Sequence, residues 1–208
     1  MPNPSLATDA WVLLKRPPAE TFRTLVVFSA EHGNLTVLLR VTKKPNASHV
    51  ALDLFDEVFL QLETRNQGQT WFVQDTQLLL RQIEIGRSYE TLRLASAFAA
   101  LVVRNNVVED SRPGVYALVR TALAAFASPA PPEIVYFKSV YCFARDEGYP
   151  LKQQWLPTLP PELRDRAARL LHTPLAELPV ASTPAAEVEA LQNHLDNYLR
   201  GYTDILVG

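Results

Sequence analysis

The spacing of apolar residues changes near residue 80, and this change constrains the fold more than any other feature. Before it, apolar residues occupy every second position, as between Leu35 and Val41. Toward the carboxyl end they recur three and four positions apart, as between Val188 and Tyr202. A period of two places one face of a strand on a core, and a period of 3.6 does the same for a helix. The pattern predicts an α+β protein, with an all-β module over residues 1–80 and an all-α module over residues 81–208.

Five strands are predicted in the first module: Trp11–Lys15, Thr21–Phe28, Leu35–Val41, Ala51–Leu62 and Thr70–Gln77. Turn-forming residues separate several of them, including Gly33 and Gly68, and glycine readily adopts the positive φ of tight turns. The alternation of the fourth strand slips at Phe55–Glu57, which predicts a bulge or bend there. Five short strands within about 80 residues suit a small closed barrel of the OB type.

Five helices are predicted in the second module. They cover about Tyr89–Asn105, a segment opening at Ser111–Pro113, Pro131–Gly148, a short segment after Pro160–Glu162, and Thr183 to Tyr202. Capping serines or threonines and prolines of the first turn mark the starts, and a glycine marks one end. The segment Leu151–Pro160 is predicted to be irregular.

Composition excludes several classes of protein. Apolar residues make up 48% of the chain and charged residues 20%, which is typical of folded globular proteins. No apolar run reaches the roughly 18 residues that span a bilayer, and the amino terminus lacks the features of a secretory signal. Cys142 is the only cysteine, which excludes an internal disulfide and a cysteine-rich zinc site. We therefore expect a cytoplasmic protein with no membrane partner.

Motifs of catalysis and cofactor binding are absent from the sequence. The four histidines do not have metal-ligand spacing, and nothing local activates Cys142. There is no nucleophile elbow, P-loop or dinucleotide-binding glycine motif. The carboxylates of Asp53, Asp56 and Glu57 could form a paired site, but solvated positions on the outer face of a barrel are the favoured interpretation. We expect no metal, no cofactor and no enzymatic activity.

Charge is unevenly distributed along the chain. The net charge of -2 argues against a strongly basic nucleic-acid binder. However, residues 1–50 carry six basic residues against the three acidic residues Asp9, Glu20 and Glu31. The basic residues are Lys15, Arg16, Arg23, Arg40, Lys43 and Lys44. Cationic side chains beside exposed aromatic rings are typical of single-strand binding. The candidate rings are Trp11, Phe22, Phe28, Trp71 and Phe72, although most are expected to fill the core.

Three stretches of the chain have a recognisable pattern, namely VLLKRPPAETFRTLVVFSAEHGNLTVLLRVTKK from Val12, ALDLFDEVFLQL from Ala51, and YFKSVYCFARDEGYPL from Tyr136. Together they resemble the RecO family of bacterial recombination mediators. The second contains a Leu-x-x-Phe element, and the third ends in Gly-Tyr-Pro, a shortened form of the family's Gly-Tyr-x-Pro. The layout of a β module before a helical module is also similar. Many members carry a four-cysteine zinc module after this point, and the chain resembles a diverged, zinc-less member.

The resemblance implies an amino-terminal OB barrel and a helical carboxy-terminal domain with a non-enzymatic role in recombinational DNA repair. That role is to bind single-stranded DNA, to assist annealing and to help load a recombinase. The implied partners are RecR and the acidic tail of single-strand-binding protein, and the implied location is cytoplasmic and nucleoid-associated. Arg40, Lys43 and Lys44 occupy the family's basic-loop position, although this loop carries less charge than is usual. Lys15, Arg16 and Arg23 are candidates from the charge distribution alone.

Two other hypotheses remain open. A protein-interaction adaptor could keep the fold and have lost most DNA affinity, as the acidic pI of about 6.1 and the reduced basic loop suggest. An enzyme with an unrecognised site has no positive support in the sequence.

Overall fold

The computed structural model describes residues 4–17, 19, 21–41, 51–64, 68–174 and 184–208. The chain divides into two compact units. The barrel unit comprises residues 1–82 and 106–116, and the helical unit comprises residues 83–105 and 117–208. The first segment of the barrel unit ends at Gln82, close to residue 80, where the sequence predicted the boundary between the two modules. The assignment of residues 106–116 to the barrel unit has no counterpart in the sequence-based prediction.

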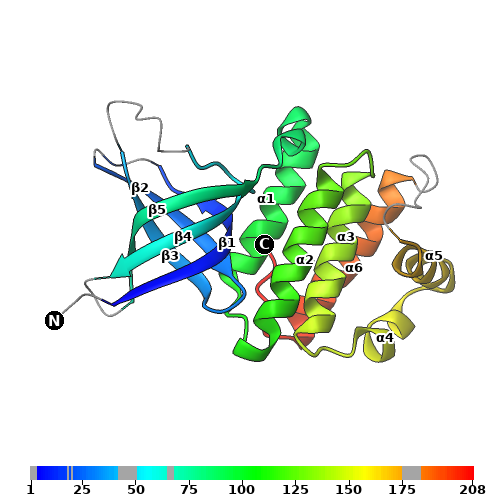
Figure 1. Cartoon of the computed structure of the whole chain (residues 1–208). Coiled ribbons are helices and arrows are strands. Elements are labelled where there is room, and N and C mark those ends of the chain that lie inside the picture. The colour runs from blue at the N-terminus through cyan, green and yellow to red at the C-terminus, as the bar shows by residue number, and fades with distance from the viewer. Residues whose placement is uncertain (1–3, 18, 20, 42–50, 65–67, 175–183) are drawn as a thin grey trace. The chain divides into compact units, whose positions relative to one another are not determined.

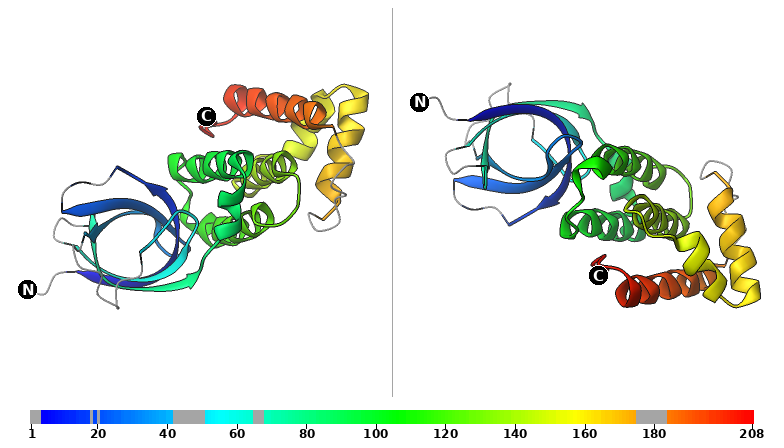
Figure 2. Two further views of the ribbon diagram at one scale, coloured as in Figure 1. Left: turned by 90° about the horizontal axis from the view of Figure 1, so that it is seen from above. Right: turned by 90° about the horizontal axis from the view of Figure 1, so that it is seen from below.

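Five strands form the barrel unit, in the order β1-β2-β3-β5-β4, and close into a barrel (Figures 1 and 2). Their bounds are β1 Ser5–Lys15, β2 Phe22–Ser29, β3 Gly33–Arg40, β4 Glu57–Thr64 and β5 Trp71–Leu80. β1 pairs with both β2 and β4, and β5 pairs with both β3 and β4. Only the β3–β5 pairing is parallel among these described strands. The α+β class, with five strands before the helices, is confirmed.

The alternation seen in the sequence accounts for the barrel core. On β1, Ala10 and Val12 point inward, and they belong to a buried cluster with residues of the other strands. The cluster consists of Ala10, Val12, Leu25, Val27, Leu35, Val37, Leu52, Val58, Leu60 and Leu62. Neighbouring positions point outward and remain available for contacts on the other face of the sheet.

The fourth strand begins six residues later than predicted, at Glu57 rather than Ala51. Before it, the chain makes a turn in which Phe55 has a φ of 66° and its amide donates to Val12 O at 2.8 Å. Asp56 stabilises the turn by accepting a hydrogen bond from the amide of Asp53 at 2.7 Å. Leu52 and Phe55 are nevertheless buried, so the segment has the apolar pattern of a strand although its backbone is not in the strand conformation. A register shift follows at Glu57/Val58.

Residues 106–116 cover part of the outer face of the barrel. The hydroxyl of Tyr116 donates to Glu57 Oε1 at 2.9 Å, and its ring lies 6.4 Å from that of Trp11. Arg112 Nη1 donates to Glu31 O at 3.1 Å. Its side chain also lies against Gly33, where φ is +67° and a Cβ would meet Arg112 Nε at 3.0 Å. The ring of Tyr116 contributes to the complete burial of Trp11, which lies on a strand face that points away from the barrel interior.

Six α-helices and three short 3₁₀ segments follow the strands in the described part of the chain. Their bounds are η1 Ile83–Arg87, α1 Tyr89–Arg104, η2 Glu109–Ser111, α2 Arg112–Phe126, α3 Pro132–Asp146, α4 Leu151–Gln154, η3 Leu156–Thr158, α5 Pro161–His172 and α6 Ala185–Tyr202. Ser88 caps α1 through its side chain. Gly148, with a φ of 92°, follows α3, as predicted for a helix end.

The α3 helix is central to the helical unit and packs against α1, α4, α5 and α6. Most of its residues are buried, including Phe137 and Tyr141, whose rings lie 6.2 Å and 5.9 Å from the ring of Trp155. Trp155 follows α4 and is fully buried. The prediction that Leu151–Pro160 is irregular is therefore wrong, because burial of Leu151, Trp155 and Leu159 orders this segment against α3.

Within the described residues, no helix combines the length and the apolarity that a membrane crossing requires.

Candidate nucleic-acid interface

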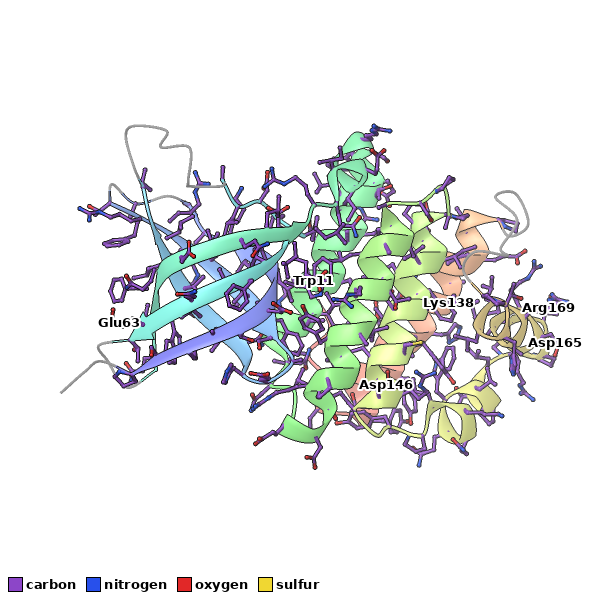
Figure 3. The ribbon with its side chains drawn as sticks, viewed as in Figure 1. Trp11, Glu63, Lys138, Asp146, Asp165 and Arg169 are labelled. Atoms are coloured by element: carbon purple, nitrogen blue, oxygen red, sulfur yellow. The ribbon has the colours of Figure 1, made fainter. Side chains whose placement is uncertain are left out.

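A pocket of about 240 Å³ lies on the barrel unit. Strands β2, β3, β4 and β5 all contribute to its lining. The lining residues are Phe22, Leu38, Arg40, Glu63, Phe72, Val73 and Gln74. Figure 3 shows Glu63 near the end of β4. The pocket thus combines two aromatic rings, one cation, one carboxylate and one amide.

The strand register explains why these residues meet. Phe22 is paired with Arg40, and Leu38 is paired with Phe72. Paired residues point to the same side of a sheet, and residues two positions apart on one strand share a face. Leu39 packs against the barrel core, so Leu38 and Arg40 point outward. The pocket therefore lies on the outer face of the β2–β3–β5 sheet.

The aromatic candidates separate into two groups. Trp11 and Phe28 are fully buried, and Trp71 packs against the barrel core. These three rings are not available as stacking platforms. Phe22 and Phe72 are half-buried at the pocket, with ring centroids 5.7 Å apart and planes inclined by 71°. Sequence alternation could not separate the two groups, because Trp11 and Phe28 lie on the same outer face as Phe22 and Phe72 and are nevertheless buried.

The basic candidates are distributed over different surfaces. Arg40 is exposed at the end of β3 and lines the pocket. Arg16 follows β1, is exposed, and its amide donates to Thr24 O at 3.0 Å. Since Thr24 is paired with Leu38, continuing the register by one residue puts Arg16 on the same outer face as Arg40.

Arg23 and Lys15 do not join this face. Arg23 is paired with Leu39 and therefore lies on the opposite side of the sheet from Phe22 and Arg40. Lys15 Nζ forms an ion pair with Asp53 Oδ1 at 2.6 Å. Lys43 and Lys44 lie outside the described residues. The structure therefore brings together two of the six basic candidates, Arg16 and Arg40.

The carboxylates of the turn before β4 each have their own partner. Arg81 donates two hydrogen bonds to Asp56, from Nε at 2.9 Å and from Nη2 at 2.7 Å. Glu57 accepts from Tyr116, and Asp53 accepts from Lys15. Burial alone would raise the pKa of Asp53, but the hydrogen bonds from Lys15 and from the amide of Leu54 lower it overall. This arrangement stabilises the turn.

The interpretation of these carboxylates as solvated is wrong for two of them. Asp56 is fully buried, and Glu57 is 5% exposed. The sequence could not indicate this, because their partners Arg81 and Tyr116 are 25 and 59 residues away along the chain. Only Asp53 is exposed among the three.

The histidines, the cysteine and the acidic residues outside this pocket are the other candidate metal ligands and nucleophiles. The described residues contain no group of three or more histidine, cysteine or acidic side chains able to hold a metal ion. Cys142 lies on α3, where burial raises the pKa of its thiol, so the reactive thiolate is disfavoured.

No protein-family model matches the chain, and no curated protein matches it.

Proposed function

We propose that this chain is a non-enzymatic protein that binds single-stranded DNA on the outer face of its barrel. The observation that carries the proposal is the joint presence of Phe22, Phe72 and Arg40 in one pocket. Half-buried rings offer stacking surfaces to unpaired bases, and an adjacent guanidinium can contact a phosphate. Arg16, on the same face, provides a second contact of this kind.

The barrel itself supports this role. Five strands in the order β1-β2-β3-β5-β4, with closure through β1 and β4, are consistent with an OB-type barrel. OB-type barrels bind oligonucleotides on the face formed by strands 2 and 3 and with nearby loops. The pocket lies on this face, and Arg16 begins the connection between β1 and β2. The resemblance to the RecO family extends the proposal to annealing and recombinase loading in DNA repair, with RecR as a protein partner.

Fluorescence anisotropy with a labelled oligothymidylate over a salt series tests this proposal on the full chain. For single strands, the logarithm of the affinity falls by about 0.7 per phosphate contact for each logarithmic unit of salt. We expect measurable binding at low salt, and we expect Arg40→Glu to weaken it at least tenfold. The double variant Lys43→Glu/Lys44→Glu tests the remaining basic-loop candidates.

Arg169→Glu on α5 is the matched control, since it makes the same charge change at an exposed arginine of the helical unit. Equal weakening by Arg40→Glu and Arg169→Glu would indicate general attraction to a charged chain and would contradict the proposed site. Absence of binding at low salt would also contradict it.

A second candidate function is a protein-interaction adaptor with little DNA affinity. The observations in its favour are the carboxylate of Glu63 in the same pocket as Arg40, and the ion pair that neutralises Lys15. Both reduce the positive potential that a phosphate chain would meet. Flat anisotropy, together with recovery of a protein partner from nuclease-treated lysate, would favour the adaptor.

A further inference from the structure

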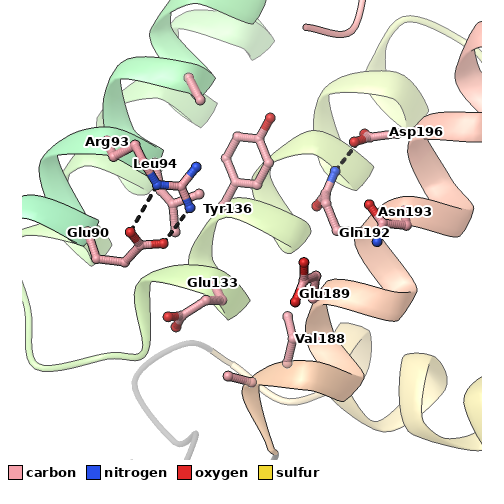
Figure 4. A pocket seen from close by; sticks show the side chains of 12 residues that line it. Glu90, Arg93, Leu94, Glu133, Tyr136, Val188, Glu189, Gln192, Asn193 and Asp196 are labelled. Carbon is pink, nitrogen blue, oxygen red and sulfur yellow. Dashed lines mark hydrogen bonds and ion pairs between the residues drawn. The ribbon is translucent and has the colours of Figure 1, made fainter.

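A larger pocket, of about 460 Å³, lies within the helical unit between α1, α3 and α6 (Figure 4). Apolar side chains form part of its lining, namely Leu94 and Ala97 from α1 and Val188 from α6. Acidic side chains from all three helices form much of the rest, namely Glu90, Glu133, Glu189 and Asp196. A pocket with apolar and acidic parts is suited to a ligand with an apolar stem and a cationic head.

The negative charge of this pocket is only partly balanced from within. Arg93 is the one basic residue among the described lining residues, and it donates from Nε and Nη2 to the carboxylate of Glu90. This pairing leaves Glu133, Glu189 and Asp196 without a basic partner in the lining. Arg200 lies near Asp196, but its guanidinium donates to Asn197 Oδ1 and Gly208 O. The pocket therefore keeps an excess of negative charge.

An unsatisfied acceptor gives an independent indication of a ligand. Gln192 Nε2 donates to Asp196 Oδ1 at 2.7 Å. Gln192 Oε1 is shielded from solvent and has no hydrogen-bond partner among the described residues. Figure 4 shows this oxygen on the side of the amide turned away from Asp196, toward Tyr136. A buried acceptor without a donor is unfavourable, so the site is suited to a ligand that supplies an N–H group.

We propose that this pocket receives an arginine side chain presented by a partner protein. The aliphatic stem of the arginine packs against Leu94, Ala97 and Val188. Its guanidinium has five N–H donors, and the lining offers carboxylate oxygens and Gln192 Oε1 as acceptors. The inference is separate from DNA binding, because the pocket belongs to the helical unit and its acidic lining repels phosphate groups.

The charge of the pocket also bears on the acidic tail that the family resemblance implies as a partner. Like charges repel strongly at a partly desolvated site. An acidic tail is therefore disfavoured in this pocket, and its binding would need a different surface.

Calorimetric titration of the full chain tests the proposal with three short peptides of identical sequence. Their central residue is arginine, citrulline or glutamate, and leucine and alanine flank it. Citrulline keeps the shape of arginine without its charge. We expect the arginine peptide to bind, the citrulline peptide to bind at least tenfold more weakly, and the glutamate peptide to show no heat of binding.

Variants then locate the binding site. We expect Glu133→Gln/Glu189→Gln to weaken binding of the arginine peptide at least tenfold. The control double variant Glu162→Gln/Asp165→Asn makes the same charge change on exposed residues of α5 and is expected to leave the affinity unchanged. Thermal melting by circular dichroism verifies that each variant is folded. Asp196→Asn provides a further single variant with the acceptor oxygen retained.

Three results would overturn the proposal. Equal affinity for the arginine and citrulline peptides would show that apolar contact alone drives binding. Equal loss in the α5 control would show diffuse attraction to an acidic protein. Binding of spermine without binding of the arginine peptide would assign the pocket to a small polyamine.

Discussion

The rings of Phe22 and Phe72 meet edge to face, with centroids 5.7 Å apart and planes inclined by 71°. Phe22 belongs to β2 and Phe72 to β5, and these strands are separated by β3. The pair therefore exists only once β3 and β5 have paired in parallel, so formation of the barrel creates the proposed stacking surface.

Removing the ring of Phe72 is expected to weaken binding of single-stranded DNA. Stacking of a base on an aromatic side chain contributes about 1–3 kcal/mol, so Phe72→Leu should weaken binding of an oligothymidylate by about 5- to 150-fold. Leucine keeps an apolar side chain and loses the flat ring. Tyr89→Leu is the control, because Tyr89 is 80% exposed on α1, outside the barrel unit. Equal loss in both variants, measured by anisotropy, would contradict the prediction.

Arginines on the two faces of the sheet around β2 should contribute differently to the salt dependence of the DNA affinity. Arg16 lies on the face that carries Arg40, and Arg23 lies on the other face. If Arg16 contacts one phosphate, Arg16→Gln lowers the magnitude of the logarithmic salt slope by about 0.7. Arg23→Gln, the same chemical change, should leave the slope unchanged. A larger change of the slope in Arg23→Gln would indicate that DNA contacts the face opposite to Arg40 and would contradict the prediction.

Two neighbouring carboxylates should differ widely in their contribution to stability. Asp56 is fully buried and accepts from Arg81 and from the amide of Asp53. Asp56→Asn removes the charged half of this pairing, and we expect the free energy of unfolding to fall by about 2–4 kcal/mol. Asp53 is 66% exposed at its ion pair with Lys15, so Asp53→Asn should cost less than about 1 kcal/mol. Urea denaturation measures both, and similar losses would contradict the assignment.

The pocket of the helical unit should reduce the stability of the protein at neutral pH. Burial raises the pKa of Asp196 above its ordinary value of 3.8. The folded state therefore binds this proton more tightly than the unfolded state, and stability decreases as pH rises from 3.8 through the folded pKa. Above that pH the unfavourable contribution of the carboxylate is fully present.

Asp196→Asn should remove this contribution and raise the melting temperature at neutral pH. The same variant should weaken binding of the arginine peptide, as is common where a functional group is kept at the cost of stability. Thermal melts of both proteins across the acid range provide the measurement. The exposed Asp165→Asn is the control, and an equal rise there would show that the effect is not specific to the pocket.

Part of the architecture could be predicted because it depends on local patterns. Period-two apolar spacing located five strands, and capping residues with prolines located the starts of the long helices. The error at Ala51–Asp56 has a physical reason. Leu52 and Phe55 are buried like strand residues, but hydrogen bonds to Asp56 and Val12 hold a turn there. Similarly, α4 and Trp155 are ordered by α3, which lies in a different part of the sequence.

The candidate site was only partly predictable. Arg40 was identified from the charge distribution, and Phe22 and Phe72 were among the candidate rings. Their meeting in one pocket with Glu63 depends on the register of four strands, which no local pattern reports. The acidic pocket was not predicted, because its carboxylates come from three helices that are distant in the sequence.

The sequence by itself determined the approximate position of most strands and of the long helices, because hydrophobic period and capping act over a few residues. Only the tertiary structure decided which side chains share a surface. Surface sharing depends on strand register and on helix packing between distant segments. Strand register put Arg40 and Arg23 on opposite faces, and tertiary contacts buried Asp56 and Glu57. Helix packing formed the acidic pocket among α1, α3 and α6.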